Sequence, residues 1–323
     1  FEWRCGNPGL AERAFTRAGD LFRSHMEKDG LSFHDCPGWI RARVYLVAAL
    51  YTQGKFDEAM EVAKELAALQ VDGGERVEEL VEGKTVVGYQ GGRLGSAGAN
   101  LVIWEARTFP ARLYLSRGEA GDFAKGIATL PKKDDPQLFR DRTLSIFYLE
   151  GLRQYLGGCK AIGAGDLEKA AFFQEAMAVT GGTMVRLQRS AAQSSSISEY
   201  LRALKTLEVL SAEYRGRFAM AGDDGQRRGA FNWFMSAVDK QMQPSMIMPP
   251  PILYPMENRL AEYFMATGNF LRAAETYQQG LVRRPNDLAV LQGYQQALLK
   301  LQRRLDAAAI QKQIDRVLGK TTR

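Results

Sequence analysis

Apolar residues recur along most of the chain with the three-to-four-residue spacing of amphipathic helices, and runs that alternate polar and β-branched residues are almost absent. The protein is therefore expected to be all-α, with its helices in antiparallel pairs. The pattern predicts helices over residues 8–28, 38–53, 56–69, 99–117, 136–162, 166–179, 196–221, 226–241, 255–267, 270–283, 287–301 and 304–318.

A short glycine-bearing turn separates several of these predicted helices. It occurs as "YTQGKFDEA" from residue 51, "AIGAGDLEKA" from residue 161 and "MATGNFLRA" from residue 265. Glycine ends one helix at such a turn, a polar residue starts the next, and the small alanine that follows allows two helices to approach closely. The recurrence predicts a repeat architecture, an α-solenoid in which neighbouring helix pairs stack.

The clearest unit begins at Tyr254 and, in a frame of 34 residues, resembles a tetratricopeptide repeat. The residues that carry the resemblance are Leu260, Ala261, Phe264, Gly268, Ala273, Tyr277, Gly280 and Pro285. The resemblance implies that the small residues let the paired helices touch, while the large ones fill the groove between them. It departs from the repeat pattern at Glu257, where a tryptophan is expected.

Further units match this frame less completely. A degenerate terminal unit begins at Leu288, and its last helix is charged enough to cap a solenoid; partial units span residues 40–69 and 154–180. The layout also resembles a group of bacterial proteins in which a helical body leads, through a proline-rich segment such as "MPPPILYPM", into C-terminal repeats.

Four regions are predicted on this basis. Residues 1–69 form N-terminal helical hairpins that include a repeat-like unit, and residues 101–243 form central helical repeats. Residues 244–323 contain the proline-rich segment with its flanking methionines (the Pro/Met segment), the C-terminal repeats and the capping helix. The glycine-rich residues 70–100 depart from the helical period and are expected to form an irregular excursion, either a mobile loop or a short hairpin at "TVVGYQGGR".

Composition and charge narrow the function classes. The 43 Lys and Arg residues exceed the 37 Asp and Glu residues by 6, but the charges are dispersed, so no nucleic-acid partner is expected. The longest apolar run, from Val44 to Tyr51, is too short to span a membrane. The chain starts without methionine, which slightly favours a processed periplasmic or extracellular protein over a cytoplasmic one. Whether Cys5 and Cys36 form a disulfide is left open by their spacing.

The sequence offers little for catalysis, and neither an enzyme nor a cofactor is expected. The glycine-rich segment lacks the Lys and Ser or Thr of a phosphate loop. His25, His34 and Cys36 are a minor candidate for a metal site, although their spacing matches no common zinc pattern. The methionines that flank the prolines suit adaptable packing better than copper binding; they are Met242, Met246, Met248 and Met256.

The leading hypothesis is a non-enzymatic scaffold that binds a protein or peptide partner on the concave face of the solenoid. The repeat resemblance implies that the first helix of each pair supplies this face. Self-assembly through repeat ends and the Pro/Met segment is the alternative. The predicted partner-binding residues are Asn258, Arg259, Glu262, Met265, Gln292, Gln296 and Lys300 in the C-terminal units, and Arg41, Tyr45 and Tyr51 in the N-terminal unit.

Overall fold

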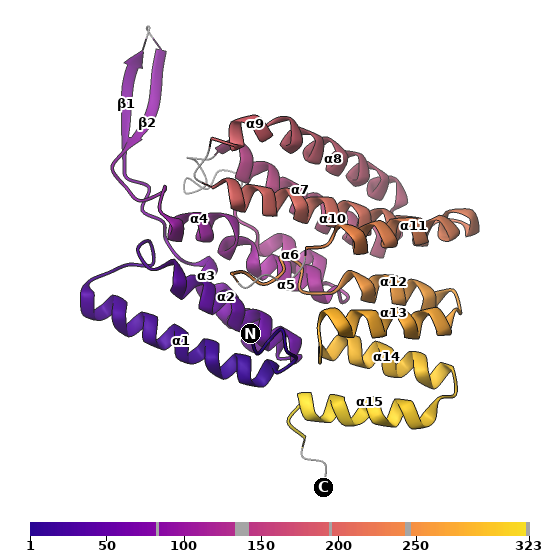
Figure 1. Cartoon of the computed structure of the whole chain (residues 1–323). Coiled ribbons are helices and arrows are strands. Elements are labelled where there is room, and N and C mark those ends of the chain that lie inside the picture. The colour runs from indigo at the N-terminus through magenta and orange to yellow at the C-terminus, as the bar shows by residue number, and fades with distance from the viewer. Residues whose placement is uncertain (82–83, 133–141, 194–195, 243–246, 321–323) are drawn as a thin grey trace.

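The fold is all-α, and successive helices pack side by side in a solenoid-like arrangement (Figure 1). The computed structural model describes residues 1–81, 84–132, 142–193, 196–242 and 247–320. The first part of the predicted helix 136–162, the residue Met246 and two serines at 194–195 lie outside this range.

The N-terminal half contains three helices, a hairpin and a group of shorter helices. Strands β1 and β2 pair antiparallel, with Glu75 opposite Gln90 and Val81 opposite Lys84. The elements are α1 (Pro8–Asp29), α2 (Pro37–Thr52), α3 (Phe56–Ala67), β1 (Glu75–Val81), β2 (Lys84–Gln90), α4 (Ala97–Trp104), the 3-10 helix η1 (Ala106–Thr108), α5 (Phe109–Arg117) and α6 (Asp122–Thr129).

The C-terminal half consists of long helices followed by two shorter pairs. Helices α7, α8, α10 and α11 pack together, and α12 to α15 continue the stack in chain order. The elements are α7 (Arg142–Gly163), α8 (Leu167–Arg186), α9 (Gln188–Ala191), α10 (Ile197–Ala221), α11 (Asp224–Lys240), α12 (Met256–Ala266), α13 (Phe270–Arg283), α14 (Leu288–Lys300) and α15 (Arg304–Val317).

The recurring glycine turn is confirmed at all three places. Gly54, Gly165 and Gly268 have φ angles of 76°, 74° and 77°, a left-handed conformation that glycine adopts without a steric penalty. The alanine that ends each turn motif is fully buried; these alanines are Ala59, Ala170 and Ala273. Ala261 and Gly280 are also buried between α12, α13 and α14. Small side chains therefore do permit close helix packing in this chain.

The predicted helix over residues 99–117 is wrong as a single element. It is broken into α4, η1 and α5, because Pro110 has no backbone N–H and its ring would clash with the preceding turn of a continuous helix. Pro110 instead occupies the first turn of α5, where no donor is needed. The short helix α6 was not predicted, and α8 continues through Gly181 and Gly182 beyond its predicted end.

The glycine-rich excursion contains a hairpin, so the loop alternative is wrong. The hairpin is longer than predicted, because β1 lies upstream of the glycines and β2 contains most of "TVVGYQGGR". Figure 1 shows it projecting from the helical body between α3 and α4. Gly92 has a φ of 71°, and a Cβ there would lie 2.3 Å from the backbone nitrogen of Gly74, so the two chains meet tightly at the base.

One hydrophobic core includes both the N-terminal and the central helices. It extends from Trp3 to Met256 and contains fully buried aromatic residues such as Trp104, Tyr155 and Tyr214. Residues of all four predicted regions therefore contribute to this core. Two smaller clusters lie among α11 to α15, where Leu260 and Tyr277 belong to one and Leu291 and Leu298 to the other.

The proline-rich segment is held by arginines against the central helices. Arg112 Nη1 donates to the carbonyl of Pro251 over 3.1 Å, Arg202 donates to that of Pro249, and Arg284 Nη2 donates to that of Ile252 over 3.0 Å. An extended segment satisfies no backbone groups internally, so side-chain donors take that role. Met248 and Met256 are buried in the core beside it, in agreement with a packing role.

The N-terminus contacts the C-terminal helices. Asn286 Nδ2 donates to the carbonyl of Gly6 over 2.7 Å, and a Cβ at Gly54 would lie 2.6 Å from Leu288 Cδ2. The turn before α14 therefore packs on the start of α1 and the end of α2. Asn286 and Leu288 are therefore in contact with the N-terminal residues and are not freely available to a partner.

The close packing at Gly98 leads to a stability prediction. A Cβ there would lie 2.1 Å from the carbonyl oxygen of Phe33, which is backbone and has little room to move. Gly98→Ala should lower the free energy of unfolding by about 1–3 kcal/mol, as overpacking does. In α11, a Cβ at Gly229 would have no described heavy atom within 4 Å. Gly229→Ala should therefore raise the free energy of unfolding by about 0.5–1 kcal/mol, because alanine is more stable than glycine inside a helix. Urea denaturation of both variants would test this, and equal effects would contradict it.

Candidate protein-binding groove

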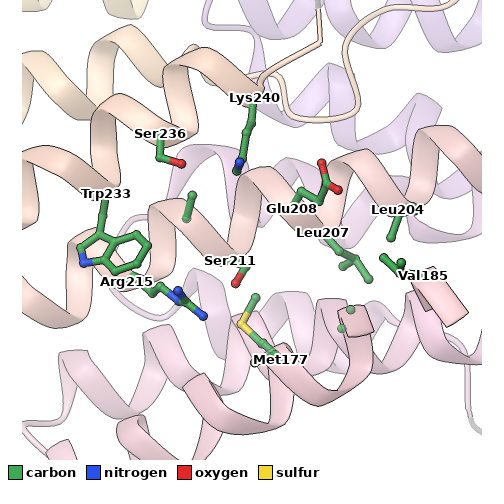
Figure 2. A pocket seen from close by; sticks show the side chains of 14 residues that line it. Met177, Val185, Leu204, Leu207, Glu208, Ser211, Arg215, Trp233, Ser236 and Lys240 are labelled. Atoms are coloured by element: carbon green, nitrogen blue, oxygen red, sulfur yellow. The ribbon is translucent and has the colours of Figure 1, made fainter. Parts of the chain in front are cut away.

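The structure contains an open groove of about 300 Å³ between α8, α10 and α11. Figure 2 shows Met177 and Val185 on one side, Trp233, Ser236 and Lys240 on the other, and side chains of α10 between them. The remaining lining residues are Gly151, Ala178, Gly181, Leu204, Leu207, Glu208, Ser211, Ala212 and Arg215.

Helical spacing produces the groove. Along α10 its residues recur at intervals of three and four positions from Leu204 to Arg215, which places them on one face. Leu201 lies one turn before this stripe and is 43% exposed. The stripe from Leu201 to Arg215 is about 20 Å long at 1.5 Å per residue. A partner helix of about four turns would match this length.

Two glycines shape the walls. A Cβ at Gly151 would lie 2.6 Å from Leu207 Cδ2, so this glycine allows α7 and α10 to approach closely beneath the groove. Gly181 on α8 has no heavy atom within 4 Å of a Cβ position, so the wall is open there. The floor residues Met177, Leu204 and Leu207 are themselves buried, so the exposed apolar surface of the groove lies at its mouth.

The mouth of the groove combines apolar surface with positive charge. Val185 is 50% exposed and Trp233 is 38% exposed. The guanidinium of Arg215 lies 4.7 Å from the centre of the Trp233 ring, a cation–π contact that holds both side chains in place. Arg215 Nε is buried and has no hydrogen-bond partner among the residues that the structure describes.

The carboxylate in the groove does not neutralise these cations. Glu208 pairs with Lys205, 3.0 Å away on the same helix. Among the described residues, no carboxylate forms an ion pair with Arg215 or Lys240. The groove therefore has an apolar floor and a net positive rim, a combination suited to an apolar segment that carries carboxylates.

The predicted C-terminal binding residues are only partly accessible. Asn258 is fully buried, and Arg259 is 10% exposed in an ion network with Glu213 at 3.2 Å and Glu262 at 3.1 Å. The prediction that Asn258 contacts a partner directly is therefore wrong, because α12 packs this residue against α13 beside Gly280. Met265 is half-buried, and Gln292, Gln296 and Lys300 are exposed, so their role stays a prediction.

The ion network around Arg259 is mostly buried, although the Glu262 side chain is 42% exposed and both residues line a pocket of about 400 Å³. Tyr155 donates to Glu213, Tyr254 donates to Glu262, and the ring of Tyr254 lies 4.0 Å from the Arg259 guanidinium. Burial acts to raise the pKa of Glu262, but Arg259 outweighs it and holds that pKa below its usual value. The two carboxylates and the nearby arginines neutralise one another, so the network contributes to folding without presenting net charge.

The predicted N-terminal residues divide between two places. Arg41 and Tyr45 line an aromatic pocket of about 350 Å³ together with Trp3, Phe15 and Phe22. Tyr45 is only 7% exposed and stacks on Phe15 with ring centres 4.8 Å apart, so it is a wall rather than an exposed contact. Tyr51 lies elsewhere, near Asp287, and burial raises its pKa well above the usual value.

The histidines and cysteines make separate contacts. His25 pairs with Asp29 on α1, whereas the Nε2 of His34 accepts the backbone N–H of Asp72 over 3.2 Å. Burial lowers the pKa of His34 and favours its neutral form, which this bond requires. Cys5 is exposed and Cys36 is buried, and both are free thiols. In the part of the chain that the structure describes, no group of three or more His, Cys, Asp or Glu side chains could hold a metal ion.

No helix among the described residues has both the length and the apolar character needed to cross a membrane. No protein-family model and no curated protein matches the chain. The groove therefore has to be interpreted from its own geometry.

Proposed function

We propose that this protein is a non-enzymatic interaction scaffold that binds a segment of a protein partner in the groove between α8, α10 and α11. The proposal rests on one observation: the exposed apolar side chains of Val185 and Trp233 line the same open groove as the cationic side chains of Arg215 and Lys240. Large apolar side chains on a water-facing surface indicate an interaction site when they border a groove. The solenoid-like fold supports such a role, because stacked helices offer long surfaces for binding.

The proposed occupant is an amphipathic helix with acidic residues beside its apolar face. Its apolar side chains, spaced at i, i+3, i+4 and i+7, would pack against the exposed Val185 and Trp233 at the mouth of the groove. Its carboxylates would pair with Arg215 and Lys240, which fix its orientation in the groove. We further propose that α12 to α15 are tetratricopeptide-like units, as the residues of that region suggest, and that they support the groove from the C-terminal side.

A peptide-display selection would test this function. A library of helical peptides about four turns long, selected on the native protein, should yield sequences with regularly spaced aromatic or aliphatic residues and flanking Asp or Glu. Their affinity for Arg215→Glu/Lys240→Glu should fall at least about tenfold, equivalent to about 1.4 kcal/mol, because attraction becomes repulsion. Fluorescence anisotropy with the selected peptides would measure this loss.

A matched control makes the same charge change elsewhere. Lys300→Glu/Arg304→Glu alters two exposed cations at the C-terminal end and should leave peptide affinity unchanged. Equal loss in both double variants would show that the effect is general electrostatics. A selection that enriches no peptides, or peptides without acidic residues that bind both proteins equally, would contradict the proposal.

A further inference from the structure

The hairpin is firmly held at its base and extends beyond the helices. Arg93 N donates to the Asp72 carbonyl over 2.9 Å, and Arg93 Nη1 donates to Ser32 Oγ over 3.0 Å. Arg93 also forms an ion pair with Asp35. Beyond this base, Figure 1 shows no helix alongside β1 or β2. An isolated two-stranded hairpin is at best marginally stable in water, so further strands or a covering surface would stabilise it.

The two edges of the hairpin differ in charge. Strand β1, "ERVEELV", carries Glu75, Arg76, Glu78 and Glu79. Strand β2, "KTVVGYQ", carries Lys84 as its only charged residue and is rich in the β-branched and aromatic types that favour strands. Exposed edge strands are usually protected from pairing by charge, proline or bulges. The β1 edge has four such charges, whereas the β2 edge has one, at its first residue.

We propose that β2 pairs with β2 of a second copy of this chain. The result would be a four-stranded antiparallel sheet, with the two β2 strands in the centre and one β1 strand at each edge. In the symmetric register Val87 lies opposite Val87 of the second copy, and Lys84 lies opposite Gln90 of the second copy. No like charges meet along this edge. The corresponding pairing of two β1 strands would set Glu78 against Glu78, which is unfavourable.

The register of the hairpin also fits the proposed sheet. Because residues alternate between faces, the opposite pairs Leu80–Thr85, Glu78–Val87 and Arg76–Tyr89 lie on one face of the hairpin. A two-fold axis perpendicular to the sheet keeps that face continuous and sets Thr85 beside Tyr89 of the second copy. This inference does not rest on the groove, which is formed by other elements.

Cysteine cross-linking tests the register directly. In a Cys5→Ser background, which removes the exposed native thiol, Val87→Cys should form a covalent dimer under mild oxidation, because the paired residues face each other across the axis. The matched variant Val77→Cys lies on β1 and should remain largely monomeric. Non-reducing electrophoresis separates the two results. Equal cross-linking of both variants, or none in either, would overturn the proposal.

Solution mass provides a second test that does not depend on oxidation. The native protein should show a concentration-dependent shift from monomer to dimer by light scattering after size exclusion. Val87→Lys should remove this shift by setting like charges opposite each other, whereas Val77→Lys on the β1 edge should retain it. Even a weak dimer with a dissociation constant of ~10 μM would be populated at about 100 μM protein. A native protein that is still monomeric at that concentration would also overturn the proposal.

Discussion

Replacing Glu105 with alanine is expected to destabilise the protein by about 3–5 kcal/mol, the range for removing one partner from a buried ion pair. Glu105 is 3% exposed and lies between two arginines, with Arg112 Nη2 at 3.0 Å and Arg202 on the other oxygen. Burial acts to raise the pKa of Glu105, but Arg202 and Arg112 outweigh it and hold that pKa low, so the carboxylate stays charged. Without it, two cations are left in the core.

The loss should extend to the proline-rich segment. Arg112 and Arg202 are also the donors to Pro251 and Pro249, and their positions depend on Glu105. Chemical denaturation of Glu105→Ala would measure the change, and proteolysis at residues 247–255 would report loosening of the segment. Glu119→Ala is the control, because Glu119 is 66% exposed in its pair with Arg117 and should matter little. Similar small losses in both variants would contradict the expectation.

The second large effect is a pH dependence that Asp287→Asn should remove. Asp287 is 2% exposed, and its Oδ1 accepts the backbone N–H groups of Ala289 and Val290 at the start of α14. Burial raises its pKa to about 6 although Arg284 acts in the opposite direction. The folded state therefore holds this proton more tightly than the unfolded chain does. Its contribution to stability grows as the pH falls from about 6 towards 4 and is lost as the pH rises through about 6.

Asparagine keeps the helix cap and does not titrate. We therefore compare the free energies of unfolding of the native protein and Asp287→Asn. As the pH falls from 7 to 4, the native protein should gain up to about 3 kcal/mol of stability relative to the variant, at about 1.4 kcal/mol per pKa unit. The lowered pKa of His34 gives an opposing slope, but it is present in both proteins and cancels in the difference. Denaturant titrations at several pH values provide the measurement. Parallel pH profiles for the two proteins would show that Asp287 does not titrate as inferred.

The helices were predictable because their signals are local. A glycine turn followed by a small residue, as at Gly268 and Ala273, can be identified from about ten residues of sequence, and most helix bounds follow within a few positions. The hairpin was only partly predictable, because Val77, Leu80 and Val81 in β1 are mixed with charges that obscure the alternation of a strand. The break near Glu105 was missed although Pro110 marks it, because the apolar period continues through it.

The candidate site was not predictable to the same degree, because it depends on contacts between distant residues. The repeat frame placed Asn258 and Arg259 on an inner face, but Asn258 is buried beside Gly280 of α13 and Arg259 pairs with Glu213 of α10. The groove depends on how α8, α10 and α11 pack. One signal was present in the sequence, since apolar residues on α10 cover more of the helix than a single packed face requires, with Leu201 left exposed.

The most direct test of the proposed function is a hydrogen-exchange footprint of a selected acidic amphipathic peptide on the native protein. The proposal predicts slower exchange in α10, α11 and the second half of α8, with little change in α14 and α15. Protection confined to α12–α15, or to the aromatic pocket at Tyr45, would contradict the assignment of the groove as the binding site.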